Sequence, residues 1–153
     1  MIEIAQKKDA QAILRVIENS IYECLLDHQN DPEIIKEWLS NKTVENVSVW
    51  IENSYSFIYK QDDEIVGFIL LSKSGGLLLN YILPEKQGIG LGSVLLKYIC
   101  DIARSNNIPK ITLESTLTAK KFYLYNQFKI IESIYENNKI VAYLMEKKIN
   151  CSN

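Results

Sequence analysis

The stretch LLLNYILPEKQGIGLGSVLL, residues 77–96, predicts both the fold and the position of the functional site. It passes from an apolar, strand-like segment through Pro84 into a glycine-rich turn, and then into an amphipathic helix. In this order of elements, several backbone N–H groups of the turn can point at one anion, and the helix adds the positive end of its dipole. The sequence therefore predicts a cradle for a phosphate-bearing ligand.

Strands can be assigned outward from this stretch. They are expected at residues 2–4, 56–60, 65–72, 77–83, 110–114, 129–135 and 140–148. The strand at 77–83 is apolar apart from Asn80 and is expected at the centre of the sheet, buried on both faces. The strand at 110–114 is expected to run parallel to it, because a strand, helix, strand unit crosses over. Asn137 and Asn138 predict the turn of a closing hairpin.

Helices are expected where a capping residue precedes an apolar period of 3.6 residues. The expected caps are Asp9, Asp31 ahead of Pro32, Thr43, and Thr116 or Thr118. A longer helix follows the glycine-rich turn and is expected to end near residues 106–109. Strands and helices together predict an α+β fold with one mixed, mostly antiparallel central sheet flanked by helices.

Length and charge restrict the class of protein. The 153 residues suit one domain, which we expect to span residues 1–149 with a loose tail at 150–153. The net charge of −2 gives no electrostatic reason to expect DNA or RNA as a partner. The three cysteines have no CxxC spacing, so they predict neither a disulfide framework nor a metal site, and they suit a cytoplasmic protein. The apolar runs are too short for a membrane span.

Several kinds of phosphate site contain a glycine-rich turn. A Walker A loop needs a lysine followed by Ser or Thr after its second glycine, and no such lysine follows Gly90 or Gly92. A dinucleotide fingerprint, G-x-G-x-x-G, needs a third glycine where this chain has Ser93. Both kinds of site therefore match poorly.

The chain instead resembles the GNAT acyltransferase superfamily. Residues 87–92 form a Q-x-x-G-x-G run directly after a strand ending in Pro84, as in the pyrophosphate-binding turn of that family. Residues 114–123, followed by Phe128, resemble its A-x-x-F-Y-x-x-x-G-F motif, although Gln127 stands where that motif prefers glycine. The order of strands and helices expected from residue 2 to 148 agrees with that of the GNAT superfamily. The residues of these motifs are most similar to those of a bacterial acetyltransferase subgroup. The family fold is therefore expected.

This resemblance implies acetyl-CoA, or another acyl-CoA, as donor and an amine of a small molecule, peptide or protein as acceptor, with no metal. The pantetheine arm is expected along the backbone of Tyr81, Ile82 and Leu83, with an N–H at Ile82 stabilising the developing oxyanion. The other residues expected at the cofactor are Gln87, Gly88, Ile89, Gly90, Leu91, Gly92, Ser93, Thr118 and Tyr123. A monomer and a homodimer are both compatible with the family.

Two residues are candidates for the chemistry. Tyr123 is the expected acid that protonates the departing thiolate, and its alternative is an ordinary half-buried helix tyrosine. Glu114 is the candidate base, acting through water, and its alternative is a capping or solvent-facing carboxylate. A lone loop histidine, His28, is expected to be solvated, and Cys24 and Cys100 are expected as small core residues.

The function that follows is an acetyl-CoA-dependent N-acetyltransferase acting by direct attack of the amine. A non-catalytic acyl-CoA-binding or sensing module is the alternative, because it would keep the cradle without needing the phenol of Tyr123. A nucleic-acid-directed acyltransferase is a third possibility, and the acidic pI counts against it.

Overall fold

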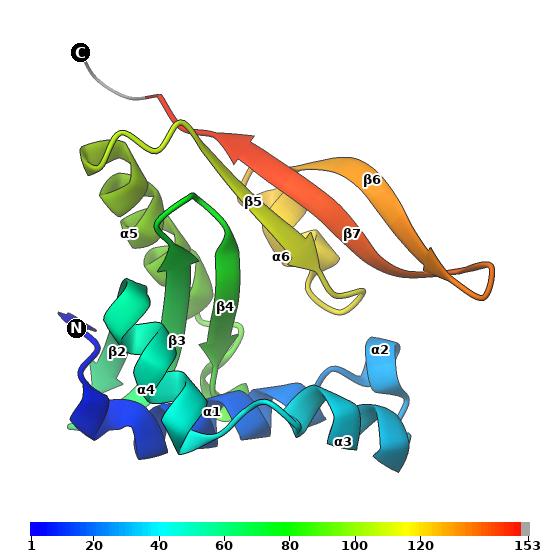
Figure 1. The fold of residues 1–153 in the computed structure, drawn as a ribbon, viewed down its shortest axis with the longest axis horizontal. Helices are drawn as coiled ribbons and strands as arrows, with labels where there is room; N and C mark the ends of the chain where they lie inside the picture. The colour runs from blue at the N-terminus through cyan, green and yellow to red at the C-terminus, as the bar shows by residue number, and fades with distance from the viewer. Residues whose placement is uncertain (151–153) are drawn as a thin grey trace.

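The structure, a computed structural model, describes residues 1–150 of the chain. Its strands form two antiparallel sheets (Figure 1). The first sheet has the order β1-β2-β3-β4 and the second the order β5-β7-β6. The strands are β1 (Ile2–Ile4), β2 (Ser54–Gln61), β3 (Glu64–Ser72), β4 (Leu77–Ile82), β5 (Lys110–Ser115), β6 (Lys129–Glu136) and β7 (Lys139–Lys148).

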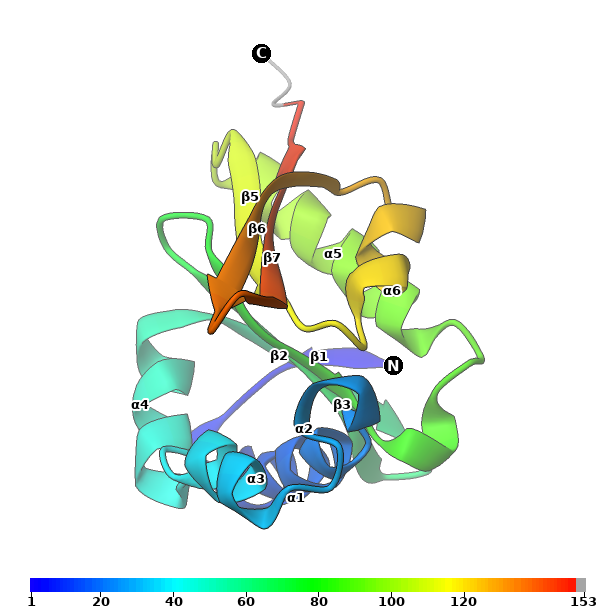
Figure 2. The same ribbon diagram turned by 90° about the vertical axis from the view of Figure 1, so that its right-hand side faces the viewer.

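Helices cover both faces of the first sheet. Figure 2 shows α1 and α4 on one side of it and α5 on the other. The helices are α1 (Ala10–Tyr22), α2 (Leu25–His28), α3 (Pro32–Leu39), α4 (Val44–Asn53), α5 (Leu91–Ser105) and α6 (Lys120–Tyr125), with 3-10 turns η1 (Lys7–Asp9) and η2 (Pro84–Lys86). The expected α+β class with flanking helices is confirmed. No helix of residues 1–150 combines the length and apolar character that crossing a membrane requires.

The core lies where α1 and α5 pack on β3. Ile13 and Ile17 of α1, and Leu95 and Ile99 of α5, have no exposed surface. These residues recur at the spacing of an amphipathic helix, so each helix turns one apolar stripe toward the sheet. Most of β3 is buried, whereas every other strand of the first sheet is partly exposed.

The expectation that the strand at 77–83 is central and buried on both faces is wrong. Leu78 of β4 is 57% exposed, and the strand lies at the edge of the first sheet. Among residues 1–150, one isolated parallel bridge joins Gly76, just before β4, to Thr112 of β5. Beyond this bridge the two strands diverge, so the strands form two sheets instead of the one mixed sheet that was expected (Figure 1).

The helix caps agree with the sequence in two cases, Asp31 and Thr43, and differ in two, Asp9 and the expected Thr116 or Thr118. Asp31 accepts from the Glu33 N–H at 2.9 Å, and Thr43 accepts from the Asn46 N–H at 3.1 Å, as expected. Asp9 precedes α1 but does not cap it, because its carboxylate accepts from the Gln6 N–H at 2.9 Å instead. The N-cap position of α6 is held by Ala119, whose N–H donates to the Thr116 hydroxyl at 3.1 Å.

Two turns use the left-handed backbone region without glycine. Asn137 and Asn138 have φ of 50° and 66°, the geometry of a two-residue hairpin turn, as expected between β6 and β7. Gln127 has φ of 71°, so it adopts the conformation that glycine provides in the related motif. The Phe128 N–H donates to the Tyr123 carbonyl at 3.0 Å across this turn. The turn that ends α6 therefore forms although glycine is absent.

One hydrogen bond involves the first residue of the expected loose tail, which otherwise stays a prediction. Arg104 Nε donates to the carbonyl of Asn150 at 3.0 Å, which attaches Asn150 to α5. The remainder of that expectation concerns residues 151–153, which lie outside the described part of the chain.

Candidate active site

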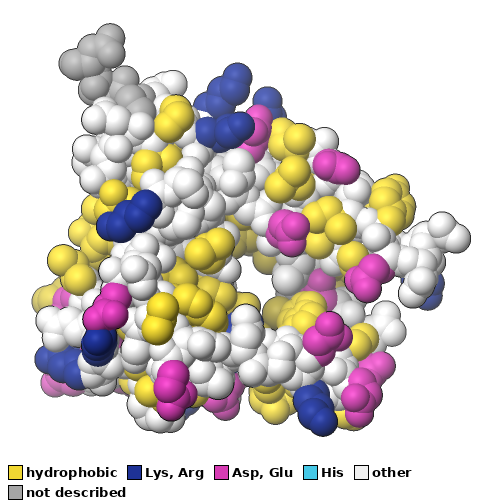
Figure 3. All heavy atoms as spheres, in the orientation of Figure 1, with side chains coloured by type: hydrophobic (Ala, Val, Ile, Leu, Met, Phe, Trp, Pro, Cys, Tyr) yellow, Lys and Arg dark blue, Asp and Glu magenta, His cyan; other side chains and the backbone are white. Residues whose placement is uncertain are grey.

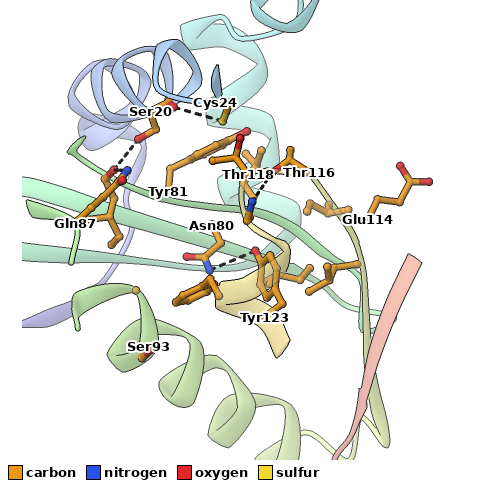
Figure 4. Close-up of a pocket in the computed structure, with 18 of the residues that line it drawn as sticks. Ser20, Cys24, Asn80, Tyr81, Gln87, Ser93, Glu114, Thr116, Thr118 and Tyr123 are labelled. Atoms are coloured by element: carbon orange, nitrogen blue, oxygen red, sulfur yellow. Dashed lines mark hydrogen bonds between the residues drawn. The ribbon is translucent and has the colours of Figure 1, made fainter. Parts of the chain in front are cut away.

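The opening between the two sheets contains a cavity of about 470 Å³ (Figure 4). In the space-filling view the face of the molecule is hollowed at this place, with hydrophobic side chains gathered around it (Figure 3). The walls come from α1, β4, the glycine-rich turn, the start of α5, the end of β5 and α6. The sequence-predicted residues that line it are Tyr81, Ile82, Gln87, Gly88, Gly90, Gly92, Ser93, Glu114, Thr118 and Tyr123.

The glycine-rich turn presents an unobstructed backbone. Gly88 and Gly90 have φ of 81° and 90°, and a Cβ at either would meet no other part of residues 1–150 within 4 Å. α5 begins at Leu91, so the N–H groups of its first turn have no acceptor within the helix. Free N–H groups and the positive end of a 15-residue helix therefore face the same end of the cavity, which suits an anion.

The predicted residues Leu83, Ile89 and Leu91 are not among those that line the cavity. The Leu83 N–H donates to the Val66 carbonyl at 2.8 Å, and Leu83 is fully buried. Ile89 is 64% exposed at the tip of the turn, and the side chain of Leu91 is part of the core. The side chains of Leu83 and Leu91 are therefore not available to a ligand in the cavity.

The edge of β4 directs two residues at the cavity. Alternate residues of an antiparallel strand exchange hydrogen bonds with the partner strand, and the bond of Leu83 to Val66 places Leu83 and Tyr81 in that set. The backbone N–H groups of Asn80 and Ile82 therefore face away from β3, toward β5. Of the three residues predicted to hold the pantetheine arm, Ile82 is the one whose N–H is directed there.

The carbonyl of Ile82 is held on that same side by two donors. Ser20 Oγ of α1 donates to it at 2.8 Å, and Gln87 Nε2 donates at 3.0 Å (Figure 4). Both donors lie outside the sheet, one before β4 and one after it. The end of β4 is therefore fixed, and its remaining polar backbone group there is the Ile82 N–H.

Tyr123 lies on α6 with its ring in the core and its hydroxyl toward the cavity. The ring makes edge contacts with Phe122 and Phe128, at centroid distances of 5.1 and 5.6 Å. Burial raises the pKa of the phenol to about 12, and a hydrogen bond from Asn80 opposes that rise. Asn80 Nδ2 donates to the phenol oxygen at 3.5 Å. At neutral pH the phenol is protonated and can act as a proton donor.

Glu114 lies at the end of β5, in the wall of the cavity but exposed. In Figure 4 its carboxylate points away from Tyr123 and Asn80. Direct contact with a group held at Tyr123 is not available in this conformation. A water molecule is required for Glu114 to act on such a group.

Asp27 of α2 holds the loop that carries Thr118, which lines the cavity. Its carboxylate accepts from the N–H groups of Leu117 and Thr118, at 2.7 and 3.0 Å, and from the Thr118 hydroxyl at 2.5 Å. This joins α2 to the loop between β5 and α6. Thr118 thus reaches the predicted site, and its hydroxyl hydrogen is already engaged by Asp27.

The expectation that His28 is a solvated loop residue is wrong. It has no exposed surface; its Nε2 lies 2.9 Å from the Ile21 carbonyl, and its Nδ1 accepts from the Asn30 N–H at 2.9 Å. The Asn30 donor requires Nδ1 to be unprotonated, so Nε2 carries the hydrogen and donates to Ile21. His28 therefore connects α1 to the turn before α3 and is structural.

The cysteines have little nucleophilic character. Cys24 lines the cavity, but burial, followed by the charges of Asp27 and Glu23, raises the pKa of its thiol to about 11. Burial also raises the pKa of Cys100, which lies in the core as expected. Because the thiolate is the reactive species, neither residue suits a covalent acyl intermediate.

Sequence reasoning missed the roles of Asn80, Ser20 and Asp27. Asn80 had a signal, because it interrupts an otherwise apolar strand. Ser20 and Asp27 had none, because each acts on a segment more than 60 residues away. Within residues 1–150, no group of three or more His, Cys, Asp or Glu side chains is arranged to hold a metal ion.

Comparison with known proteins gives a family match over most of this chain. The sequence model of the acetyltransferase (GNAT) domain matches residues 18–149. The sequence has no significant match among curated proteins.

Solved structures share the fold at low sequence identity. A GCN5-related N-acetyltransferase from Rhodopseudomonas palustris superimposes with a TM-score of 0.84 at 16% identity, covering 97% of this chain and 94% of that one. PaiA N-acetyltransferase from Thermoplasma acidophilum, in complex with coenzyme A, gives 0.80 at 21% identity, covering 97% and 98%. The ribosomal-protein-S18-alanine N-acetyltransferase from Escherichia coli gives 0.68 at 18% identity, covering 100% and 96%.

Proposed function

The chain belongs to the GNAT acetyltransferase family, and on this premise we propose that it transfers an acetyl group from acetyl-CoA directly to an acceptor amine. The observation that carries the proposal is the convergence of three features on one cavity. These are the bare glycine-rich turn at the start of α5, the outward N–H of Ile82, and the buried phenol of Tyr123.

The residues present suit coenzyme A. The backbone amides of residues 88–93 are placed for a pyrophosphate, because glycines leave them uncovered and the α5 dipole favours negative charge. The open edge of β4 at Asn80 and Ile82 offers polar backbone groups to an extended arm, as an added strand would use them. The related PaiA N-acetyltransferase was solved with coenzyme A, which supports this choice of ligand.

Bound acetyl-CoA supplies the acetyl group as an activated thioester. Ile82 donates its N–H to the acyl oxygen, where negative charge develops as the amine attacks. Tyr123 donates its hydrogen to the departing sulfur, since the phenol stays protonated up to about pH 12. Glu114 accepts, through water, the proton that the amine loses when the carbon–nitrogen bond forms and the carbon–sulfur bond breaks. No acyl-cysteine forms, in keeping with the raised pKa of Cys24.

The acceptor is an amine of a small molecule or of a peptide or protein. We would test this by incubating the protein with acetyl-CoA and a panel of amino acids, polyamines, aminoglycosides and peptide N-termini, and measuring the CoA thiol released. Transfer to at least one amine is expected. Binding of acetyl-CoA without transfer to any amine would instead support a non-catalytic binding or sensing module.

The role of Tyr123 has a matched control on the same helix. Tyr123→Phe removes the phenol, and we expect the rate of transfer to fall by about 10²–10⁴-fold, as for the loss of a positioned acid. Tyr125 is 83% exposed on α6, so Tyr125→Phe should leave the rate unchanged. Equal rates in both variants would remove the phenol from the mechanism.

A further inference from the structure

Asn80 is a polar side chain in an apolar part of the cavity wall. It projects from β4 between neighbours that are mostly leucine and isoleucine, and its amide faces Tyr123 (Figure 4). Within residues 1–150, its Oδ1 is one of two buried side-chain atoms that lack a hydrogen-bond partner, the other being Gln61 Oε1. Buried polar atoms are seldom left unpaired in folded proteins, so this one requires an explanation.

The two ends of the amide face different groups. Nδ2 donates to the phenol oxygen of Tyr123 at 3.5 Å, a long bond of the kind that often shortens when a ligand binds. A phenol has one hydrogen, and its oxygen here accepts from Asn80. The hydrogen of Tyr123 is therefore not used by Asn80 and remains available to another acceptor.

The other end of the amide, Oδ1, can only accept hydrogen bonds. It belongs to a residue that lines the cavity, and it has no donor among residues 1–150. Because Oδ1 is itself buried, a ligand N–H would satisfy it when the side chain shifts toward the cavity. Once Oδ1 holds such a donor, the amide cannot rotate without losing two hydrogen bonds, so Nδ2 stays on the phenol.

We propose that Asn80 is a positioning residue that couples Tyr123 to the bound ligand: Nδ2 keeps the phenol hydrogen free, and Oδ1 accepts a hydrogen bond from a ligand N–H. This rests on the proposed acetyl transfer. Two ligand groups share the required chemistry, an amide N–H of the pantetheine arm and the N–H of the acceptor amine. In either case the ligand fixes the amide in the orientation that leaves the phenol hydrogen free to be donated.

Two variants separate the ends of the amide. Asn80→Asp keeps oxygen acceptors but removes the N–H donor. The phenol of Tyr123 then donates its hydrogen bond to the carboxylate and not to the departing sulfur. We expect the turnover number to fall to within about threefold of that of Tyr123→Phe. Asn80→Leu removes both ends at similar size. Asn53→Leu is the control, because Asn53 is exposed at the end of α4 and bonds only to the Val49 carbonyl in the described structure.

A double-mutant cycle tests whether Asn80 acts through Tyr123 rather than through the fold. In the Tyr123→Phe background, Asn80→Asp should lower the turnover number by no more than about twofold further, because both changes remove the same proton donation. An independent structural effect would instead multiply the two losses, and this result would overturn the proposal.

Affinity measurements on Asn80→Leu show which ligand donates to Asn80 Oδ1, because the variant weakens the binding of either CoA or the acceptor amine. If the pantetheine arm provides the N–H, Asn80→Leu raises the dissociation constant of CoA about tenfold by calorimetry. If the acceptor provides it, the dissociation constant of CoA is unchanged and the KM of the most active amine in the panel rises about tenfold. Changes below twofold in both quantities would contradict the role of Oδ1.

One measurement does not depend on acetyl transfer. In protein labelled with ¹³C at tyrosine Cζ, the resonance of Tyr123 is the one lost in Tyr123→Phe. Asn80→Leu should shift that resonance, because the phenol oxygen loses a donor, and Asn53→Leu should not. If no amine is acetylated but this shift and the change in CoA affinity are seen, the proposed function fails while the contacts of Asn80 stand. An unmoved resonance overturns the contact whatever the activity.

Discussion

Ser20 of α1 donates a hydrogen bond from its buried hydroxyl to the Ile82 carbonyl of β4 at 2.8 Å, across 62 positions of sequence. Gln87 donates to the same carbonyl from the other side. α1 and the glycine-rich turn thereby hold the end of β4 in the region where this strand has diverged from β5. This fixes the direction of the Ile82 N–H, on which the proposed stabilisation of the acyl oxygen depends.

Removing the Ser20 hydroxyl should loosen this end of the strand. Ser20→Ala is expected to lower the free energy of unfolding by about 1 kcal/mol, the usual contribution of one hydrogen bond, since Gln87 still holds the carbonyl. The turnover number should fall several-fold, with a smaller change in CoA affinity. Denaturant unfolding and steady-state kinetics measure both. Ser40→Ala is the control, because the Ser40 hydroxyl bonds an exposed carbonyl at the end of α3.

Gly90 should be required for the ligand rather than for packing. Its φ of 90° makes Gly90→Ala cost about 1–2 kcal/mol of stability, and the added methyl projects into the open face of the turn. We expect the affinity for CoA to fall at least tenfold, measured by calorimetry.

The matched control for Gly90 is Gly75→Ala, where φ is 103° and a Cβ would lie 2.6 Å from the Lys110 carbonyl oxygen. Gly75→Ala should lower the free energy of unfolding. The folded fraction of that variant should still bind CoA with the affinity of the native protein. Equal loss of CoA affinity in the two variants would contradict the assignment of the turn as the pyrophosphate site.

Gln127 carries a backbone conformation that glycine would adopt more easily. At φ of 71°, Gln127→Gly should relieve strain and raise the free energy of unfolding by about 0.5–1 kcal/mol, after allowance for the greater flexibility of glycine in the unfolded chain. Gln11→Gly, on the exposed side of α1, should lower it by a similar amount. Thermal unfolding of the pair gives the comparison, and destabilisation by Gln127→Gly would show that the turn is not strained.

The raised pKa of Tyr123 predicts a loss of stability in alkali. The phenol ionises near pH 10 in the unfolded chain and about pH 12 in the folded protein, so stability from this residue is intact below pH 10. Between pH 10 and 12 it declines by roughly 1.4 kcal/mol per pH unit, because only the unfolded chain releases the proton. Burial also raises the pKa of Tyr81, which adds a decline of the same sign.

The comparison that isolates Tyr123 is urea unfolding of the native protein and Tyr123→Phe between pH 9 and 11. The variant should show the shallower decline, while the contribution of Tyr81 remains in both. Identical slopes would mean that Tyr123 ionises normally and is not held in a dry environment.

Local features of the sequence predicted local structure. Asp31 and Thr43 cap their helices because an N-cap bond depends on residues two or three positions away. The glycine-rich turn was predicted for the same reason, since positive φ and the following apolar period are both local. Asn137 and Asn138 likewise determine their turn without help from the rest of the chain.

Features that depend on distant contacts were missed or misplaced. The apolar residues of β4 look like those of a buried central strand, but whether Leu78 is covered depends on how far β5 follows it past Gly76. His28 is buried because α1 turns the Ile21 carbonyl toward it. The contact between Asp27 and Thr118 joins segments 91 positions apart, and no local pattern records it.

The measurement that tests the central claim most directly is thermal unfolding of the native protein with and without 1 mM acetyl-CoA. A ligand at about 100 times its dissociation constant stabilises by ~2.7 kcal/mol, which for a chain of this length raises the Tm by roughly 5–10 °C. We predict such a rise, and a smaller one in Gly90→Ala. An unchanged Tm in the native protein would contradict the assignment of the cavity between β4 and β5 as an acyl-CoA site.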